Sequence, residues 1–314
     1  MSENREPLCE MADGLFAELR GQEFGIVWDR LEDAGFALLL LPEHSGGFGG
    51  DWGDLAAVMR LAGKHALAAP LGEHIIARRL LHDAGATADG IVTLASGGAV
   101  PWGRCGRAIV NHVGVSHLAN LDASNSTNAA GEPRDIVDID LGSAQALEVE
   151  ADVHALIAFL RVCQTAGALD AALALSIEYT GQRVQFGRQL SKFQAVQQSI
   201  AVLAMEAAVV NCAAQGAAAA IDRYGYGGKA SFEIGAAKLR ANAAIKGGNA
   251  IAHQVHGAIG FTQDYPLHEL TRRMMGWRSE GGNDAFWSRV IGEQVLRWGG
   301  DGLWDNLTLR TDPA

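Results

Sequence analysis

Three cations lie within ten residues of one another near the middle of this chain: Arg183, Arg188 and Lys192. Amide and aromatic side chains accompany them, namely Gln185, Phe186, Phe193, Gln194, Gln197 and Gln198. Cations bind phosphate groups, amides donate and accept hydrogen bonds, and aromatic rings provide flat apolar surface. Together these residues indicate a dinucleotide-like ligand. The alternative interpretation is a basic connection between two helices whose cations face water.

A second stretch with chemical potential runs over residues 253–282. Gly257 and Gly260 bracket a tight turn after a helical run, where glycine lets the backbone approach a ligand with its N–H groups exposed. Pro266 restarts the chain, and apolar residues at helical spacing follow before Glu280 stands beside two glycines. A carboxylate between flexible residues at a helix end can lean into a pocket. The alternative is an ordinary helix–turn–helix with a solvated glutamate.

The bulk composition indicates a globular protein that binds neither nucleic acid nor an anionic membrane. The chain has 314 residues, 48% hydrophobic and 19% charged, and its formal net charge is −11. Both of those partners need a basic face, so an anionic ligand must be held by a local cluster of cations. The apolar run 200–221 is interrupted by Glu206, Asn211 and Gln215, which predicts a packed helix and no membrane span.

Metal and disulfide chemistry are not indicated. The four cysteines stand far apart, and no carboxylate or thiol completes a ligand set with His253, His256 and His268. The chain begins without a basic segment followed by an apolar one, so we expect no signal peptide and a cytoplasmic protein with reduced thiols.

The helices and strands that the sequence predicts around these residues make up a mainly α fold with a small β domain. We expect an N-terminal helical domain over 1–88, a shortened β domain over 89–150 and a C-terminal four-helix bundle over 151–314. In the first, Asp54 is the expected cap of a helix over 55–65, after a glycine-rich loop that lacks the lysine of a nucleotide loop. In the second, strands are expected over 91–94, 107–113 and 146–149, and a polar loop over 120–134. In the third, long helices are expected over 155–183, 192–224 and 231–255.

Two motifs carry a family resemblance. Residues 183–187, RVQFG, followed by 193–197, FQAVQ, resemble the FAD-binding signature of the acyl-CoA dehydrogenases. Residues 253–262, HQVHGAIGFT, followed by PLH at 266–268 and TRR at 271–273, resemble the second signature of that family. Weaker similarity to its N-terminal helical domain lies at LPE, 41–43, and APL, 69–71.

The resemblance implies FAD shared across a subunit interface and the α,β-dehydrogenation of an acyl-CoA thioester. It places Arg183 on the pyrophosphate, Gln185 and Phe186 along the dinucleotide and Gln194 on its distal half. It places a second set on the same flavin, contributed by a neighbouring subunit: Gln254, Val255, His256 and Gly257. Acyl-CoA as substrate and electron-transfer flavoprotein or a similar acceptor as redox partner are also implied.

Glu280 is the base that the resemblance implies, since it stands shortly after the arginine pair and just before a glycine. It would remove the α-proton while the β-hydrogen leaves as hydride to flavin N5. Residues 277–281, WRSEG, resemble a branch in which two different dehydrogenase-like subunits assemble, often on bulky acyl groups such as steroid side chains. Two alternatives stay open: a non-catalytic partner subunit that completes a neighbour's FAD site, and a flavin oxidase.

Overall fold

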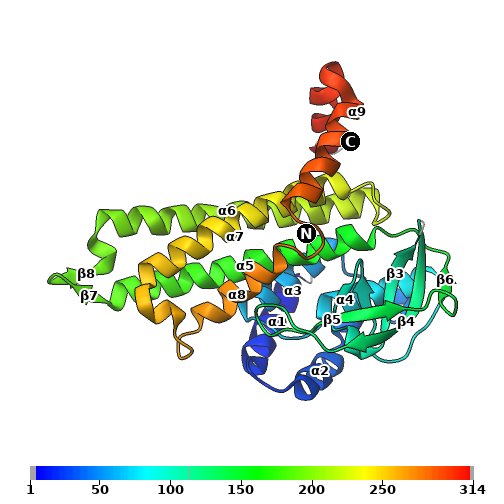
Figure 1. Cartoon of the computed structure of the whole chain (residues 1–314), viewed down its shortest axis with the longest axis horizontal. Helices are drawn as coiled ribbons and strands as arrows, with labels where there is room; N and C mark the ends of the chain where they lie inside the picture. The colour runs from blue at the N-terminus through cyan, green and yellow to red at the C-terminus, as the bar shows by residue number, and fades with distance from the viewer. Residues whose placement is uncertain (1–4, 113, 312–314) are drawn as a thin grey trace.

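The protein is described here by a computed structural model that covers residues 5–112 and 114–311. Long helices form one half of the molecule, and a small sheet flanked by the N-terminal helices forms the other (Figure 1). The chain passes from the N-terminal helices through the sheet and then into the long helices. The mainly α fold with a small β region, expected from the sequence, is confirmed.

Four α-helices make up the N-terminal region: α1 (Arg5–Leu19), α2 (Phe24–Asp33), α3 (Trp52–Lys64) and α4 (Leu71–Asp83). Two short 3-10 helices, η1 (Phe36–Leu38) and η2 (Glu43–Ser45), lie in the connection before α3. The expected cap of α3 was misplaced by three residues. Asp51 is the N-cap and accepts from the Asp54 amide, while the Asp54 carboxylate accepts from the Asp51 amide. This reciprocal capping box requires a second acceptor at the third helical position, which is the place that Asp54 occupies.

The β region holds more strand than its sequence pattern indicates. Its strands are β1 (Thr93–Ala95), β2 (Ala99–Pro101), β3 (Arg107–His112), β4 (Val115–Ser124), β5 (Arg134–Ile139) and β6 (Gln145–Leu147), with η3 (Gly103–Cys105) before β3. They pair in the order β1-β3-β4-β5-β2, with β6 added on β4, and only the β1–β3 pair is parallel. The expected polar loop over 120–134 is therefore wrong at its start, since 120–124 continues β4. Val113, at the end of one expected strand, lies outside the described residues.

Three long helices form the body of the C-terminal region: α5 (Val153–Gln182), α6 (Gln194–Tyr224) and α7 (Ser231–His256). A two-stranded hairpin, β7 (Val184–Gln185) and β8 (Arg188–Gln189), and η4 (Leu190–Lys192) connect α5 to α6. After η5 (Gly257–Phe261) come α8 (Leu267–Trp277) and α9 (Asp284–Thr311), which is kinked at Gly299 and stands out from the bundle (Figure 1).

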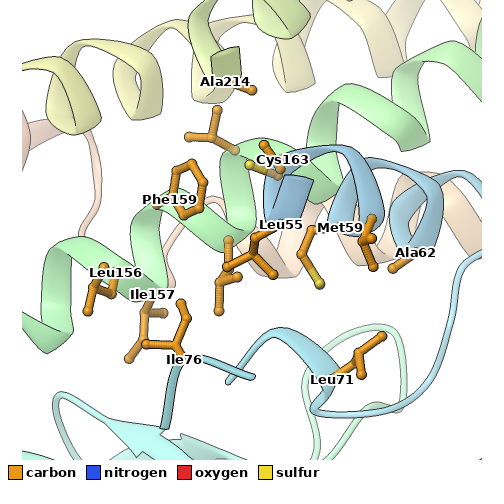
Figure 2. Packing of buried hydrophobic residues seen from close by; sticks show 14 of the residues in the cluster. Leu55, Met59, Ala62, Leu71, Ile76, Leu156, Ile157, Phe159, Cys163 and Ala214 are labelled. Carbon is orange, nitrogen blue, oxygen red and sulfur yellow. The ribbon is translucent and has the colours of Figure 1, made fainter. Parts of the chain in front are cut away.

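Helix α5 is the centre of the hydrophobic core, and α3, α4 and α6 contribute to the same cluster. Figure 2 shows Phe159 and Cys163 of α5 close to Leu55 and Met59 of α3. Helices α3 and α5 approach each other through glycine. A Cβ atom on Gly167 would lie 1.7 Å from the Arg60 carbonyl oxygen, which is far inside van der Waals contact.

Helices α5 and α6 are long and apolar enough to cross a membrane by length and composition. The apolar window of α5 is 83% buried inside the protein, so α5 is a core helix, while the window of α6 is only 28% buried. The expectation of a packed helix over 200–221 therefore holds for one side of α6. The other side exposes Val202, Met205 and Val209.

We predict that Gly167→Ala lowers the free energy of unfolding by about 1–3 kcal/mol or more, because the added methyl group has no space against the α3 backbone. Gly216→Ala on α6 is the matched control. Nothing lies within 4 Å of its Cβ position, so it should stabilise the helix by about 0.5–1 kcal/mol. Urea unfolding followed by circular dichroism measures both, and equal effects of the two substitutions would contradict this packing.

Candidate functional site

A cavity of about 610 Å³ lies at the end of the bundle where α5, α6 and α7 meet. Both motifs singled out in the sequence line it. Arg183 and Gln185 come from the end of α5 and from β7, and residues 254–259 come from the end of α7 and from η5. The two segments therefore meet at one cavity within a single chain. The volume lies within the roughly 300–1,000 Å³ of small-molecule and cofactor sites.

The β7–β8 hairpin places the first motif at the rim of this cavity. Its two tip residues, Phe186 and Gly187, both have positive φ, at 51° and 78°. Glycine adopts this backbone readily, whereas phenylalanine adopts it at a cost, and such strain is concentrated at functional positions. The Phe186 ring is 91% exposed. Beside it, the Arg188 guanidinium lies 4.0 Å from the centre of the Phe193 ring.

Helix α6 presents its N-terminus to the cavity, which Ala195, Val196 and Ser199 line. The helix starts without a side-chain cap hydrogen bond and without an acidic residue in its first turn. Val196 N–H donates to the Phe193 carbonyl oxygen at 3.0 Å, so the first-turn amides open to an anion are those of Gln194 and Ala195, together with the positive end of the helix dipole. Arg183 lines the same cavity and adds a formal positive charge.

The inner wall of the cavity is aromatic and neutral. Tyr179 stacks on His256, with ring centres 4.9 Å apart and planes at 21°. His256 Nδ1 lies 2.7 Å from the Ala252 carbonyl oxygen, so Nδ1 donates, and Nε2 lies 3.1 Å from the Tyr265 hydroxyl. Burial lowers the pKa of His256, which keeps this imidazole uncharged at neutral pH. At the next bend, Gly257 has φ 65° and ψ −141°, a conformation that suits glycine alone.

The structure thus brings most of the expected ligand residues together at one place: Arg183, Gln185, Gln254, Val255, His256 and Gly257. Phe186 and Gln194 are not among the residues that line the cavity. Phe186 is the hairpin tip, and Gln194 is the exposed first residue of α6, next to the lining residue Ala195. Tyr179 and Ser199 line the cavity and were not expected from the sequence, because neither belongs to a recognisable motif.

This set of donors fits the dinucleotide of FAD. A cation and an uncapped helix end suit the pyrophosphate, amide side chains suit ribose and adenine, and an aromatic wall suits a flat base. Arg183, Gln185 and Gln254 are exposed, so their polar groups can reach a ligand.

Glu280 lies far from this cavity, between α8 and α9, and is bound by two arginines. Arg134 Nε of β5 donates to its Oε1 at 2.7 Å, and Arg161 Nε of α5 donates to its Oε2 at 2.6 Å. The side chain is 14% exposed, and those of Arg134 and Arg161 are 8% and 2% exposed. Arg161 also donates to Glu73 of α4 at 2.5 Å. On the other side, Glu132 pairs with both Arg134 and Arg273 of α8.

The two arginines determine the acid–base behaviour of this carboxylate. Burial alone would raise its pKa. The nearby positive charges of Arg161 and Arg134 lower the pKa by more than burial raises it, and the net value is about 2. A carboxylate with so low a pKa is a weak base, and both of its oxygens already accept hydrogen bonds. In this conformation Glu280 is therefore an ion-pair partner that links β5 to α5 and, through Arg161, to Glu73 of α4. Neither arginine was expected, because they lie 146 and 119 residues away in sequence.

Lys238 of α7 fixes the turn that leads to Glu280. Its buried Nζ donates to the Trp277 and Arg278 carbonyl oxygens at 2.6 and 3.2 Å and to Asn242 Oδ1 at 2.9 Å. Burial lowers the pKa of Lys238 to about 7, although the Glu280 charge opposes that shift. The lysine acts as a cap on the last carbonyl groups of α8. In the described part of the chain, no group of three or more histidine, cysteine or acidic side chains could hold a metal ion.

Comparison with known proteins finds a family match in the C-terminal region of this chain. Residues 157–296 match the model of the acyl-CoA dehydrogenase C-terminal domain. Over 257 residues the chain is 26% identical to the acyl-CoA dehydrogenase IpdE2 of Mycobacterium tuberculosis, covering 78% of each chain. It is 25% identical over 264 residues to the protein of the same name in Mycolicibacterium smegmatis, covering 78% of this chain and 79% of that one.

Two solved structures share the fold of this chain over almost their whole length. The ChsE4-ChsE5 complex from Mycobacterium tuberculosis gives a TM-score of 0.81 at 18% identity, covering 94% of this chain and 98% of that one. A variant of the Tcur3481-Tcur3483 steroid acyl-CoA dehydrogenase gives 0.83 at 20% identity, with the same coverage. At these identities the likeness shows the fold alone.

We predict that Glu280→Gln loses about 3 kcal/mol of unfolding free energy at pH 7, because the pKa falls from 4.5 to about 2 on folding. A lowered carboxylate pKa contributes fully above about pH 4.5, and the contribution is lost as pH falls towards 2. The difference between wild type and variant should therefore shrink over that range. Glu293→Gln, whose side chain is 51% exposed, is the control and should change stability by less than about 1 kcal/mol. Urea unfolding between pH 3 and pH 7 measures this, and a difference independent of pH would contradict the ion-pair role.

Proposed function

Because this chain belongs to the acyl-CoA dehydrogenase superfamily, as an acyl-CoA dehydrogenase or a subunit of one, we propose that it serves the α,β-dehydrogenation of an acyl-CoA thioester. Its own contribution is to hold the dinucleotide half of FAD in the cavity at the end of the bundle. The supporting observation is the meeting of both flavin signatures at that cavity. FAD, when bound, supplies the acceptor for the hydride that leaves the β-carbon.

Different residues at the cavity bind different parts of FAD. Arg183 and the N-terminus of α6 bind the pyrophosphate, where a cation and free amides act together. Gln185 lines the dinucleotide from the cavity wall, while Phe186 at the hairpin tip and Gln194 at the start of α6 contact the ligand from outside the lining, Gln194 on its distal half. Residues 254–257 close the opposite side, with the backbone of Gly257 able to approach the ligand closely.

The flavin is shared between chains. Arg161 and Arg183 stand 22 positions apart along α5 and the residue that follows it, a separation of about 33 Å at 1.5 Å per residue. The acidic group at Glu280 and the dinucleotide cavity of one chain therefore belong to two different flavin sites. The exposed apolar face of α6 provides the kind of surface that a second subunit covers.

The partner is a second dehydrogenase-like chain, and the proton base of the flavin held here belongs to that chain. The ion pairs of Glu280 support this assignment, because they make it a weak base in its own chain. Two of the solved structures with this fold are named as pairs of different subunits, and one of those is named a steroid acyl-CoA dehydrogenase. We propose a bulky, steroid-like acyl group on the substrate. Electron-transfer flavoprotein, or a similar protein, is the proposed electron acceptor.

The second candidate keeps Glu280 as the base of this chain's own active site. Its place after the arginine pair of α8 and directly before Gly281 favours this role. It requires that Arg134 and Arg161 release the carboxylate when substrate binds. The two candidates differ in what replacement of Glu280 does to catalysis.

We predict that Arg183→Ala weakens FAD binding at least tenfold in the complex of this chain with its partner, since a hydrogen bond to a charged group contributes about 1.5–3 kcal/mol. The complex is co-purified, and FAD is titrated while its visible absorbance and fluorescence are followed. Arg289→Ala on α9 is the matched control, because this arginine is 63% exposed and far along the chain from the cavity. Equal affinity in Arg183→Ala and wild type, or no uptake of FAD by any pairing, would contradict the proposal.

We predict that Glu280→Gln in the same complex keeps the rate of substrate-dependent flavin bleaching within about tenfold of wild type. The measurement is stopped-flow absorbance well below the melting temperature, on a sample whose FAD content matches wild type. A loss of a thousandfold or more with FAD still bound would assign the base to Glu280 and remove the first candidate. Glu293→Gln controls for the removal of a charge near the end of the chain.

A further inference from the structure

A second cleft, of about 270 Å³, lies where the three regions of the chain meet. The turn after α1, the connection before α4, the loop before β5 and the outer side of α8 all line it. Its charged and titratable lining groups are Arg20, His268, Glu269, Arg272 and Arg273. Three arginines against one glutamate form a local excess of positive charge in a chain whose net charge is −11.

We propose that this cleft, here called the three-region cleft, binds a phosphate group. The inference is independent of the proposed function, because the cleft shares no lining residue with the flavin cavity. Arginine suits phosphate because its planar guanidinium can donate two parallel hydrogen bonds to the oxygens.

Arg272 is the residue on which the site depends. Its Nε donates to the Ala129 carbonyl oxygen at 2.8 Å, which fixes the base of the guanidinium against the β region. Among the described residues, no hydrogen bond or ion pair satisfies its two terminal nitrogens. The side chain is exposed, and its α8 position places it beside the other lining arginines. A guanidinium held at one nitrogen and open at two others is preorganised to receive an anion.

The other two arginines are partly occupied, and one of them can change partner. Arg273 donates to buried Glu132 at 3.0 Å and to the Glu269 carbonyl oxygen, so it contributes charge from a fixed place. Arg20 pairs with Glu269 at 2.9 Å, and both side chains are 38% exposed. An exposed pair of this kind contributes about 0–1 kcal/mol, so an entering phosphate can compete for Arg20 at little cost. His268 Nδ1 lies 2.8 Å from the Tyr265 carbonyl oxygen, which fixes this ring at the edge of the cleft.

The size of the cleft limits what enters. At about 30 Å³ for each water molecule, 270 Å³ corresponds to roughly nine waters. This volume is below the roughly 300 Å³ at which pockets for drug-sized ligands begin. One phosphate group with a few waters is therefore accommodated, whereas a whole nucleotide is not. The phosphate is either a free ion or the end of a larger molecule that extends into solvent.

The test measures the melting temperature of the full chain with inorganic phosphate, with sodium chloride of equal ionic strength, and with coenzyme A. Phosphate should raise the melting temperature of wild type by several degrees over chloride, because it binds the folded state and bridges Arg20 and Arg272. Arg272→Ala should lose this increase, and Arg272→Lys should keep part of it. Arg289→Ala, an exposed arginine on α9, should keep all of it.

Protection by coenzyme A at a lower concentration than phosphate, lost in Arg272→Ala, would identify the end of a larger molecule as the ligand of this cleft. Coenzyme A protection that Arg272→Ala keeps arises at another site, and the phosphate result then identifies the free ion. The proposal is overturned if phosphate gives wild type no more protection than chloride, or if Arg272→Ala is protected as well as wild type. Neither result affects FAD binding, which Arg183→Ala tests separately.

Discussion

A buried chain of alternating charges holds the three regions of this protein in one arrangement. Glu73, Arg161, Glu280, Arg134, Glu132 and Arg273 follow one another as ion-pair partners, drawn in turn from α4, α5, the segment after α8, β5, the loop before it and α8. Three cations match three anions, so the network as a whole is neutral. Pairs buried this deeply add little net stability, but loss of one member leaves an uncompensated charge. The network therefore selects one relative placement of sheet and bundle.

This buried network and the dinucleotide cavity lie towards opposite ends of α5. Near the start of the helix, Arg161 fills the space beside Glu280 and keeps that carboxylate ionised. Beyond its end, Arg183 and the β7–β8 hairpin form an open cavity with an aromatic wall. One rigid, buried helix thus connects a closed site and an open site. A protein with this layout suits an assembly in which each chain completes the site of another.

Local sequence patterns predicted the elements whose residues interact with near neighbours. The long helices were expected over 155–183, 192–224 and 231–255, and α5, α6 and α7 begin and end within about two residues of those bounds. The cavity was predictable in part, since Arg183 and Gly257 belong to motifs. Strands β4 and β5 were missed because alternation there includes many polar residues. The surroundings of Glu280 could not be read from sequence, because Arg134 and Arg161 reach it only through the tertiary fold.

The tip of the β7–β8 hairpin has a consequence for assembly. Phe186 holds a left-handed backbone conformation, which costs a non-glycine residue about 1–2 kcal/mol, and it does so with its ring almost fully in water. The hairpin thus bears this cost in the isolated chain. Because the hairpin already holds this backbone conformation, burial of the ring by another surface requires no further ordering of the backbone at the tip, which lowers the entropic cost of association.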